Sequence, residues 1–297
     1  MIINGVEIED TFAELFDIKI ARILITALDY EWALIAAREA VGFGTSVIMC
    51  PAEAGIEKLA SPEETPDGRA GVYIMICHPN EKNLEKQLIA RIGQCVLTAP
   101  TTAVFDGFPE SEKKFDVGNK IRYFGDGFEK QVEVGGRKCW SIPIMEGEFI
   151  IENDIGYING LAGGNIIIMG ENQTSALMAA KAAVDAISNV EGVITPFPGG
   201  IVASGSKVGS KKYKFLVAST NEKFCPSLRD VVDTNIPSNV KSVYEIVING
   251  ISIEHIKKAM RIGILAATKV PGVIKITAAN FEGKLGKHKI NLLDLFK

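Results

Sequence analysis

The chain repeats itself, and this internal repeat constrains the fold more than any other feature of the sequence. Residues 8–40 align without gaps on residues 151–183, at a constant offset of 143. Further along, residues 72–76 match residues 243–247 at an offset of 171. A chain of 297 residues is long enough for two domains of ordinary size. We therefore predict two related lobes, residues 1–147 and 148–297.

One glutamate interrupts the repeat. Where the first copy has Ile74, the second has Glu245, inside an apolar segment predicted to be a strand. Alternation along a strand places Val243, Glu245 and Val247 on one face. Apolar neighbours disfavour the charged carboxylate and raise its pKa, and a neutral acid can donate a hydrogen bond to a developing oxyanion. The alternative is a buried ion pair with an Arg or Lys.

Each half shows the element order strand–helix–strand, strand–helix–strand. This βαββαβ order is typical of the ferredoxin-like α+β fold, an antiparallel sheet with two helices on one face. In the first half we expect strands at 22–27, 46–50, 72–77 and 96–99, and helices at 31–41 and 83–92. In the second half we expect strands at 165–169, 193–195, 243–248 and 273–277, and helices at 173–187 and 252–268, with Ser252 as an N-cap.

Two stretches lie outside the repeat. Residues 106–146 are predicted to form an inserted β-hairpin because glycines separate short apolar runs. Residues 196–242 form a long loop within the second half, and long insertions in compact domains are commonly functional. We predict that residues 196–212 line a substrate cleft, and that residues 211–217 form a strand. The predicted binding residues are Pro198, Gly199, Gly200, Ser204 and Ser206.

Part of the same insertion nearly matches the sequence motif of a nucleotide-binding phosphate loop. Gly200 and Gly205 have the required spacing, but Ser206 stands between Gly205 and Lys207, whereas the motif needs the lysine directly after the second glycine. A loop that cradles substrate with its backbone N–H groups is favoured over a nucleoside triphosphate site. A plain turn is the remaining alternative.

Composition excludes several classes of partner. A net charge of −4 gives no reason to expect nucleic acid or an anionic membrane as a partner. The N-terminus lacks a signal sequence, so we expect a cytoplasmic protein. Five dispersed cysteines indicate reduced, mostly buried thiols, and three histidines without ligand spacing give no argument for a metal. Cys50 is interpreted as a core thiol at a strand end rather than a nucleophile, and the acidic run 53–64 as solvated.

Several long segments resemble one known family from end to end. They are residues 4–13, 42–55, 65–69, 92–95, 124–127, 196–204, 243–250 and 283–286. The chain resembles the formylmethanofuran–tetrahydromethanopterin formyltransferases of archaeal one-carbon metabolism. One departure is residues 279–282, where a more glycine-rich segment is expected.

The resemblance implies a mechanism and an assembly. It places the catalytic glutamate of the segment Val-Tyr-Glu-Ile-Val-Ile at Glu245. It implies direct formyl transfer in a ternary complex, in methanogenesis or its reverse, with methanofuran and tetrahydromethanopterin as coenzyme substrates and neither a prosthetic group nor a metal. It further implies a homotetramer, a dimer of dimers, with the active site at a subunit interface. The alternative is a non-catalytic small-molecule-binding module of duplicated ferredoxin-like fold.

Overall fold

The computed structural model describes residues 1–205, 207–234 and 236–297, which form two compact units. Unit 1 comprises Met1–Asp17 and Leu161–Lys297, and unit 2 comprises Ile18–Gly160. This division differs from the predicted halves because strand pairing attaches the first 17 residues to the C-terminal part of the chain. Within the described residues, no helix is both long enough and apolar enough to cross a membrane.

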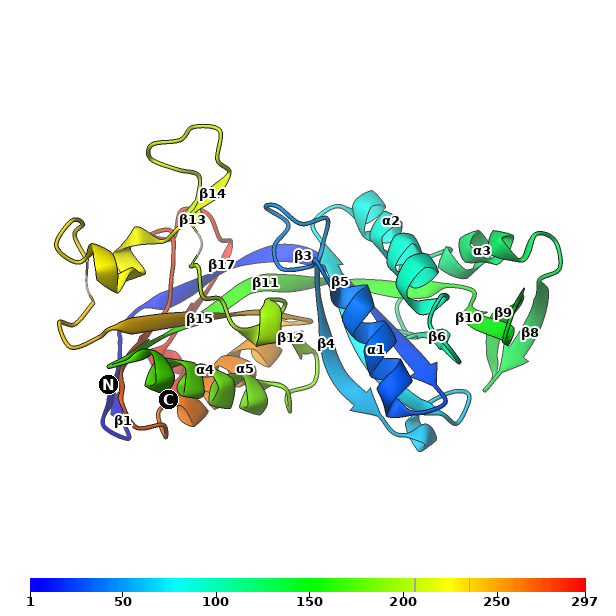
Figure 1. The fold of residues 1–297 in the computed structure, drawn as a ribbon, viewed down its shortest axis with the longest axis horizontal. Helices are drawn as coiled ribbons and strands as arrows, with labels where there is room; N and C mark the ends of the chain where they lie inside the picture. The colour runs from blue at the N-terminus through cyan, green and yellow to red at the C-terminus, as the bar shows by residue number, and fades with distance from the viewer. Residues whose placement is uncertain (206, 235) are drawn as a thin grey trace. The chain divides into compact units, whose positions relative to one another are not determined.

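Unit 2 combines strands with two longer helices and one short helix (Figure 1). Its strands are the second part of β3 (Phe12–Ala27), then β4 (Glu53–Ala60), β5 (Ala70–His78), β6 (Ala103–Asp106), β7 (Lys114–Phe115), β8 (Lys130–Val134), β9 (Arg137–Ile144), β10 (Gly147–Glu152) and the start of β11 (Ile155–Gly170). Its helices are α1 (Tyr30–Val41), α2 (Glu81–Arg91) and α3 (Val117–Ile121), with short helical turns at Pro62–Glu64, Ile92–Val96 and Arg122–Gly125.

Unit 1 has a similar plan around the second part of β11. Its other strands are β1 (Ile2–Ile3), β2 (Val6–Ile8), the start of β3, β12 (Val193–Ile194), β13 (Lys207–Val208), β14 (Ala218–Ser219), β15 (Ser242–Gly250), β16 (Val273–Thr277) and β17 (His288–Asn291). Its helices are α4 (Gln173–Ile187) and α5 (Ile253–Ala267), with short turns at Pro198–Gly200, Glu222–Phe224, Pro226–Leu228 and Leu293–Phe296. Figure 1 shows α4 and α5 side by side next to β15.

The pairing is mixed rather than purely antiparallel, which corrects the predicted sheets. In unit 2, β5 pairs with β3 and β4 in antiparallel register, but β6 and β10 run parallel. In unit 1, β11 pairs with β15 and β16 in antiparallel register, but β2 and β16 run parallel. Together with the helices, these pairings make the fold mixed α+β.

The four long helices are confirmed apart from their end residues, because their start signals are local. Asp29, Asn80, Asn172 and Ser252 each accept a backbone N–H from the first turn of the helix that follows. Alanines on α1 and α4 allow close packing on the strands, and both helices bury four of them, at 33, 36, 37 and 40 and at 176, 179, 180 and 183. The inserted hairpin is confirmed as β8–β9, which turns at Gly135 and Gly136, both with positive φ.

Three predicted strands are wrong. Residues 46–50 form a turn, Val96 ends a π-helical turn that residues 97–99 follow, and residues 211–217 form a loop. The strand expected at 46–50 lies instead at Glu53–Ala60, inside the acidic run predicted to be solvated. Glu53 and Glu57 are buried there: Glu53 accepts the Val47 N–H at 3.1 Å, and Glu57 bonds Arg22.

All five cysteines are free thiols, but only Cys77 and Cys139 are buried, so the prediction of mostly buried thiols is wrong. Cys50 lies in a turn rather than at a strand end and is half-buried. Burial raises the pKa of Cys50, but hydrogen bonds from Ser46 and Thr45 outweigh that effect and lower it.

Strand register shows that the repeat was aligned one residue off in its second part. In unit 2, Ile23 pairs with Ile74, whereas in unit 1 the counterpart of Ile23, Ile166, pairs with Ile246. Ile246 therefore takes the place of Ile74, and the predicted match of Ile74 with Glu245 is wrong. The helix N-caps that follow, Asn80 and Ser252, are offset in the same way.

This one-residue difference in register places Glu245 on the opposite face of the sheet from Ile74, because successive strand residues point to opposite faces. Ile246 and Ile248 pack in the core beneath α4 and α5. Glu245 lies on the other face, beside Val243 and opposite Ile167. Its counterpart in unit 2 is Tyr73, which pairs with Leu24. The carboxylate thus replaces a side chain on the face away from the helices.

Glu14 on β3 fixes the C-terminal loop of unit 1. Its buried carboxylate accepts the backbone N–H groups of Phe281 at 2.8 Å, Leu285 at 3.2 Å and Gly286 at 2.7 Å, and also that of Gly283. Burial raises the pKa of Glu14, but these four donors outweigh it and lower the pKa below 4.5. Positive φ at Glu282 and Gly283 aims the N–H groups inward, although Glu282 is not glycine.

We expect Glu14→Gln to destabilise the protein by about 1–3 kcal/mol, because the amide NH₂ meets N–H donors where an oxygen accepted them. A lowered pKa contributes stability above the unfolded value, and this contribution disappears as pH falls through the folded value. Glu14→Gln should therefore lose its effect in acid. Denaturant titrations at pH 7 and below pH 4 measure this, with the exposed Asp17→Asn as the control. An equal loss of stability at both pH values would contradict the assignment.

Candidate functional site

A pocket of about 190 Å³ within unit 1 contains Glu245. Its walls come from β11, from β15 and from the long insertion that was predicted to be functional. The lining residues are Ile167, Val202, Ala203, Ser204, Gly205, Asn221, Phe224, Cys225, Pro226, Ser227, Val243 and Glu245. Most of the surface is apolar, so the single carboxylate dominates its electrostatics.

The insertion is tied to the strand at Glu245 itself. Val202 donates its N–H to the Glu245 carbonyl at 2.7 Å, and the Glu245 N–H donates to the Val202 carbonyl at 3.1 Å. This isolated bridge satisfies the backbone of Glu245 without using its side chain. The side chain is thereby positioned on a rigid strand and faces the pocket.

The Glu245 carboxylate is in an environment that disfavours charge. Burial raises its pKa from 4.5 to about 7. Among the described residues, none forms a hydrogen bond or ion pair with this carboxylate, so the alternative of a buried ion pair is not realised there. At neutral pH a large fraction of the group is a neutral acid, which can donate a hydrogen bond to an oxygen in the pocket.

Only some of the predicted binding residues line the pocket. Ser204 lines the pocket together with Glu245. Pro198, Gly199 and Gly200 form the turn that leads to Val202 and do not line it. Gly200 has a φ of 76° and packs so closely that a Cβ there would lie 2.7 Å from Val184 of α4. Ser206 lies outside the described residues.

The wall of the pocket that faces Glu245 is not predicted from the sequence. Asn221, Phe224, Cys225, Pro226 and Ser227 come from two short helical turns later in the insertion. These turns have no periodic pattern, and their few apolar residues, from Phe224 to Leu228, do not form a helical or strand repeat. The length of the insertion was the only signal available for this wall.

The structure also argues against a phosphate loop. Lys207 begins the short strand β13 instead of a helix, and its Nζ lies 2.6 Å from the Glu222 carboxylate. Lys211 bonds the same carboxylate at 2.6 Å. These two lysines lower the pKa of Glu222 to about 2, so both are already engaged with this carboxylate. A phosphate would have to compete with this carboxylate.

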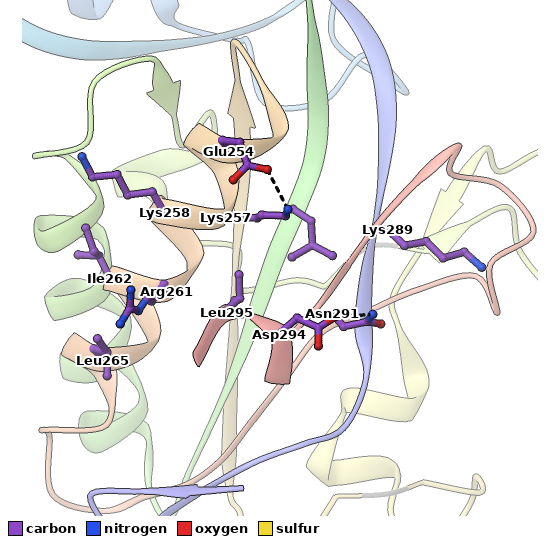
Figure 2. A pocket seen from close by; sticks show the side chains of 11 residues that line it. Glu254, Lys257, Lys258, Arg261, Ile262, Leu265, Lys289, Asn291, Asp294 and Leu295 are labelled. Carbon is purple, nitrogen blue, oxygen red and sulfur yellow. Dashed lines mark hydrogen bonds and ion pairs between the residues drawn. The ribbon is translucent and has the colours of Figure 1, made fainter. Parts of the chain in front are cut away.

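A second, larger pocket of about 620 Å³ lies between α5 and the C-terminal segment of unit 1. Figure 2 shows that its cations do not converge: Lys258 and Lys289 point in opposite directions. Lys257 is paired with Glu254 at 2.9 Å. No carboxylate described in this pocket has a pKa raised as that of Glu245 is, so the smaller pocket is the candidate site. Across the described part of the chain, no group of three or more His, Cys, Asp or Glu is arranged to hold a metal.

Comparison with known proteins finds one family over nearly the whole chain. A family model described as formylmethanofuran-tetrahydromethanopterin formyltransferase matches residues 1–144, and one described as its proximal lobe matches residues 147–295. The formylmethanofuran–tetrahydromethanopterin formyltransferases of Archaeoglobus fulgidus and Methanopyrus kandleri are 73% and 60% identical to the chain, each over the whole of both chains.

Two solved structures share the fold over the whole chain. The formyltransferase from Methanosarcina barkeri has a TM-score of 0.98 at 63% identity, and covers all of both chains. A chain of the formyltransferase/hydrolase complex of Methylorubrum extorquens, solved with methylofuran, has a TM-score of 0.95 at 42% identity, and 99% of that chain is covered. With both family models and full-length relatives in agreement, the chain belongs to the formylmethanofuran–tetrahydromethanopterin formyltransferase family.

Proposed function

We propose that this chain transfers a formyl group between formylmethanofuran and tetrahydromethanopterin, in archaeal one-carbon metabolism. The observation that carries the proposal is Glu245, a half-buried carboxylate that lines the pocket and has no partner among the described residues. Full-length relatives that bear this activity support it. Both coenzymes act as substrates, and the reaction needs no redox step.

In the proposed mechanism, a nitrogen of the pterin attacks the formyl carbon of formylmethanofuran. A C–N bond forms and the formyl oxygen becomes an oxyanion, which accepts a hydrogen bond from protonated Glu245. Collapse of this tetrahedral intermediate breaks the old C–N bond. The pterin nitrogen loses a proton and the methanofuran nitrogen gains one, so formyl, charge and protons all balance.

Two physical effects are sufficient for a useful rate. Holding both coenzymes in attack geometry lowers the barrier by roughly 7–11 kcal/mol. One well-placed oxyanion donor contributes about 2.7–4 kcal/mol. The pocket supplies the donor on a rigid strand, where its position is defined by the backbone bridge to Val202.

Three further features belong to this proposal. The matching order and helix caps in the two units support duplication of a ferredoxin-like lobe. The family resemblance supports a homotetramer, a dimer of dimers with the cleft at a subunit interface, and a cytoplasmic location. The Methylorubrum relative is part of a complex and its structure contains methylofuran, which supports a site for the furan coenzyme.

Formyl transfer should proceed without added metal or nucleotide. We expect purified protein, dialysed against a strong chelator, to retain its full rate with both coenzymes, because an acid donor and substrate positioning supply the chemistry. Transfer is followed by the change in coenzyme absorbance. Loss of activity that a single metal restores would contradict this prediction, and tight binding of both coenzymes without turnover would favour the non-catalytic binding module.

A further inference from the structure

A narrow hairpin arises from the rim of the Glu245 pocket. Ser204 and Gly205 precede β13, Asn221 follows β14, and all three line the pocket. The two arms are joined by the pairs Lys207–Ser219 and Val208–Ala218. Near the base, the Thr220 hydroxyl donates to the Ser204 carbonyl at 3.2 Å. The loop between these strands, residues 209–217, extends from unit 1 (Figure 1).

This hairpin tip is strongly cationic. Residues 207–221 contain four lysines and no acidic residue. Glu222 at the base pairs with Lys207 and Lys211. Lys212 and Lys214 are exposed, and neither forms an ion pair with any described residue. Glu222 balances only one of its two lysine partners, so the hairpin has a net excess of three positive charges, two of them at Lys212 and Lys214 near its tip.

The same tip exposes aromatic rings that contribute nothing to a core. Tyr213 is 48% exposed and Phe215 is 79% exposed, with their ring centroids 5.9 Å apart. Lys212 lies over the Tyr213 ring at 5.4 Å. Exposing aromatic rings to water is unfavourable for a loop that only contacts solvent. Rings that alternate with lysines suit a ligand that has an anionic group and a flat or extended apolar part.

We propose that the hairpin tip, Gly209–Val217, binds an anionic substituent, a carboxylate or a phosphate, of a coenzyme whose reacting end lies in the Glu245 pocket. The arms of the hairpin connect its tip to the Glu245 pocket, since the residues at the base of the hairpin line the pocket. The tip then contributes affinity and selectivity while Glu245 contributes chemistry. This inference rests on the proposed function for the identity of the ligand.

The test replaces the two uncompensated lysines with glutamate, as the double variant Lys212→Glu with Lys214→Glu. Both side chains are exposed, so the fold should be retained, and the double alanine variant provides a milder change. We expect KM for one coenzyme to rise roughly 2- to 30-fold with kcat unchanged, as two exposed ionic contacts are lost. The salt dependence of that KM should weaken. The matched control is Lys258→Glu, an exposed lysine of the pocket in Figure 2.

Binding measured without turnover separates the two proposals. Equilibrium titration of each coenzyme, with hydrogen exchange of residues 209–217, should show weaker binding in the double variant and protection of the tip in the wild type. A coenzyme shortened to its reacting end should bind the wild type and the variant equally. Unchanged affinity for both full coenzymes in the double variant would overturn the role of the hairpin. Absence of formyl transfer by the wild type would instead overturn the proposed function, and the titration would still decide the hairpin.

Discussion

Replacing Glu245 by alanine is expected to slow formyl transfer by roughly two to three orders of magnitude, because one oxyanion donor is worth about 2.7–4 kcal/mol. Single-turnover rates at saturating coenzymes measure this loss. Glu245→Gln keeps a neutral donor of similar length and should retain more activity than alanine. Glu245→Asp keeps the acid but shortens its reach, and a displacement of about an ångström can cost roughly a hundredfold.

The pH dependence should have a defined direction. Burial raises the pKa of Glu245 to about 7, so the acid form that donates predominates below that value. The wild-type rate should therefore fall as pH rises through about 7, and Glu245→Gln, which does not titrate, should lack this decline. If glutamine proved no better than alanine while the fold stayed intact, a charged or proton-transferring carboxylate would be the better account.

Glu57→Gln is expected to cost about 3 kcal/mol in the free energy of unfolding of unit 2. Arg22 donates to the Glu57 carboxylate through Nε at 2.6 Å and through Nη2 at 3.1 Å, and the Glu57 side chain is 1% exposed. The guanidinium also stacks on Tyr73, 4.0 Å from the ring centroid. Glutamine removes one charge of the pair and leaves a mostly buried cation beside it.

Tryptophan fluorescence during denaturation measures this change in one unit alone, because both tryptophans, Trp32 and Trp140, lie in unit 2. The control is Glu81→Gln, which removes the partner of Lys19 in a surface pair and should cost less than about 1 kcal/mol. Equal shifts for Glu57→Gln and Glu81→Gln would show that burial adds nothing to the Arg22–Glu57 pair.

The Arg22–Glu57 pair also explains why strand prediction failed in this region. Glu53 and Glu57 make the segment look solvated, and only their tertiary partners allow it to be a buried strand. The strand expected at 46–50 failed for the opposite reason: a short apolar run does not by itself define a strand. The long helices were predictable because apolar period and N-caps are both local in sequence.

Glu245 could be singled out from sequence, because a carboxylate flanked by valines in a strand is visible without a structure. The structural counterpart of Ile74 is Ile246 rather than Glu245, one residue from the match that the sequence favours. The sequence match of Val-Tyr with Val-Tyr favoured one offset, but backbone pairing and the helix caps follow another. Register depends on which face is buried, and only the packed helices define that face.

The chain's own sequence determined the long helices and singled out Glu245 as the proposed hydrogen-bond donor, since each depends on neighbours within a few positions. The tertiary structure alone decided three things: that Glu245 faces away from α4 and α5, that its carboxylate has no partner among the described residues, and that residues 221–227 form the opposite wall. Each depends on contacts between segments far apart in sequence, and no local pattern records which of those contacts form or fail to form.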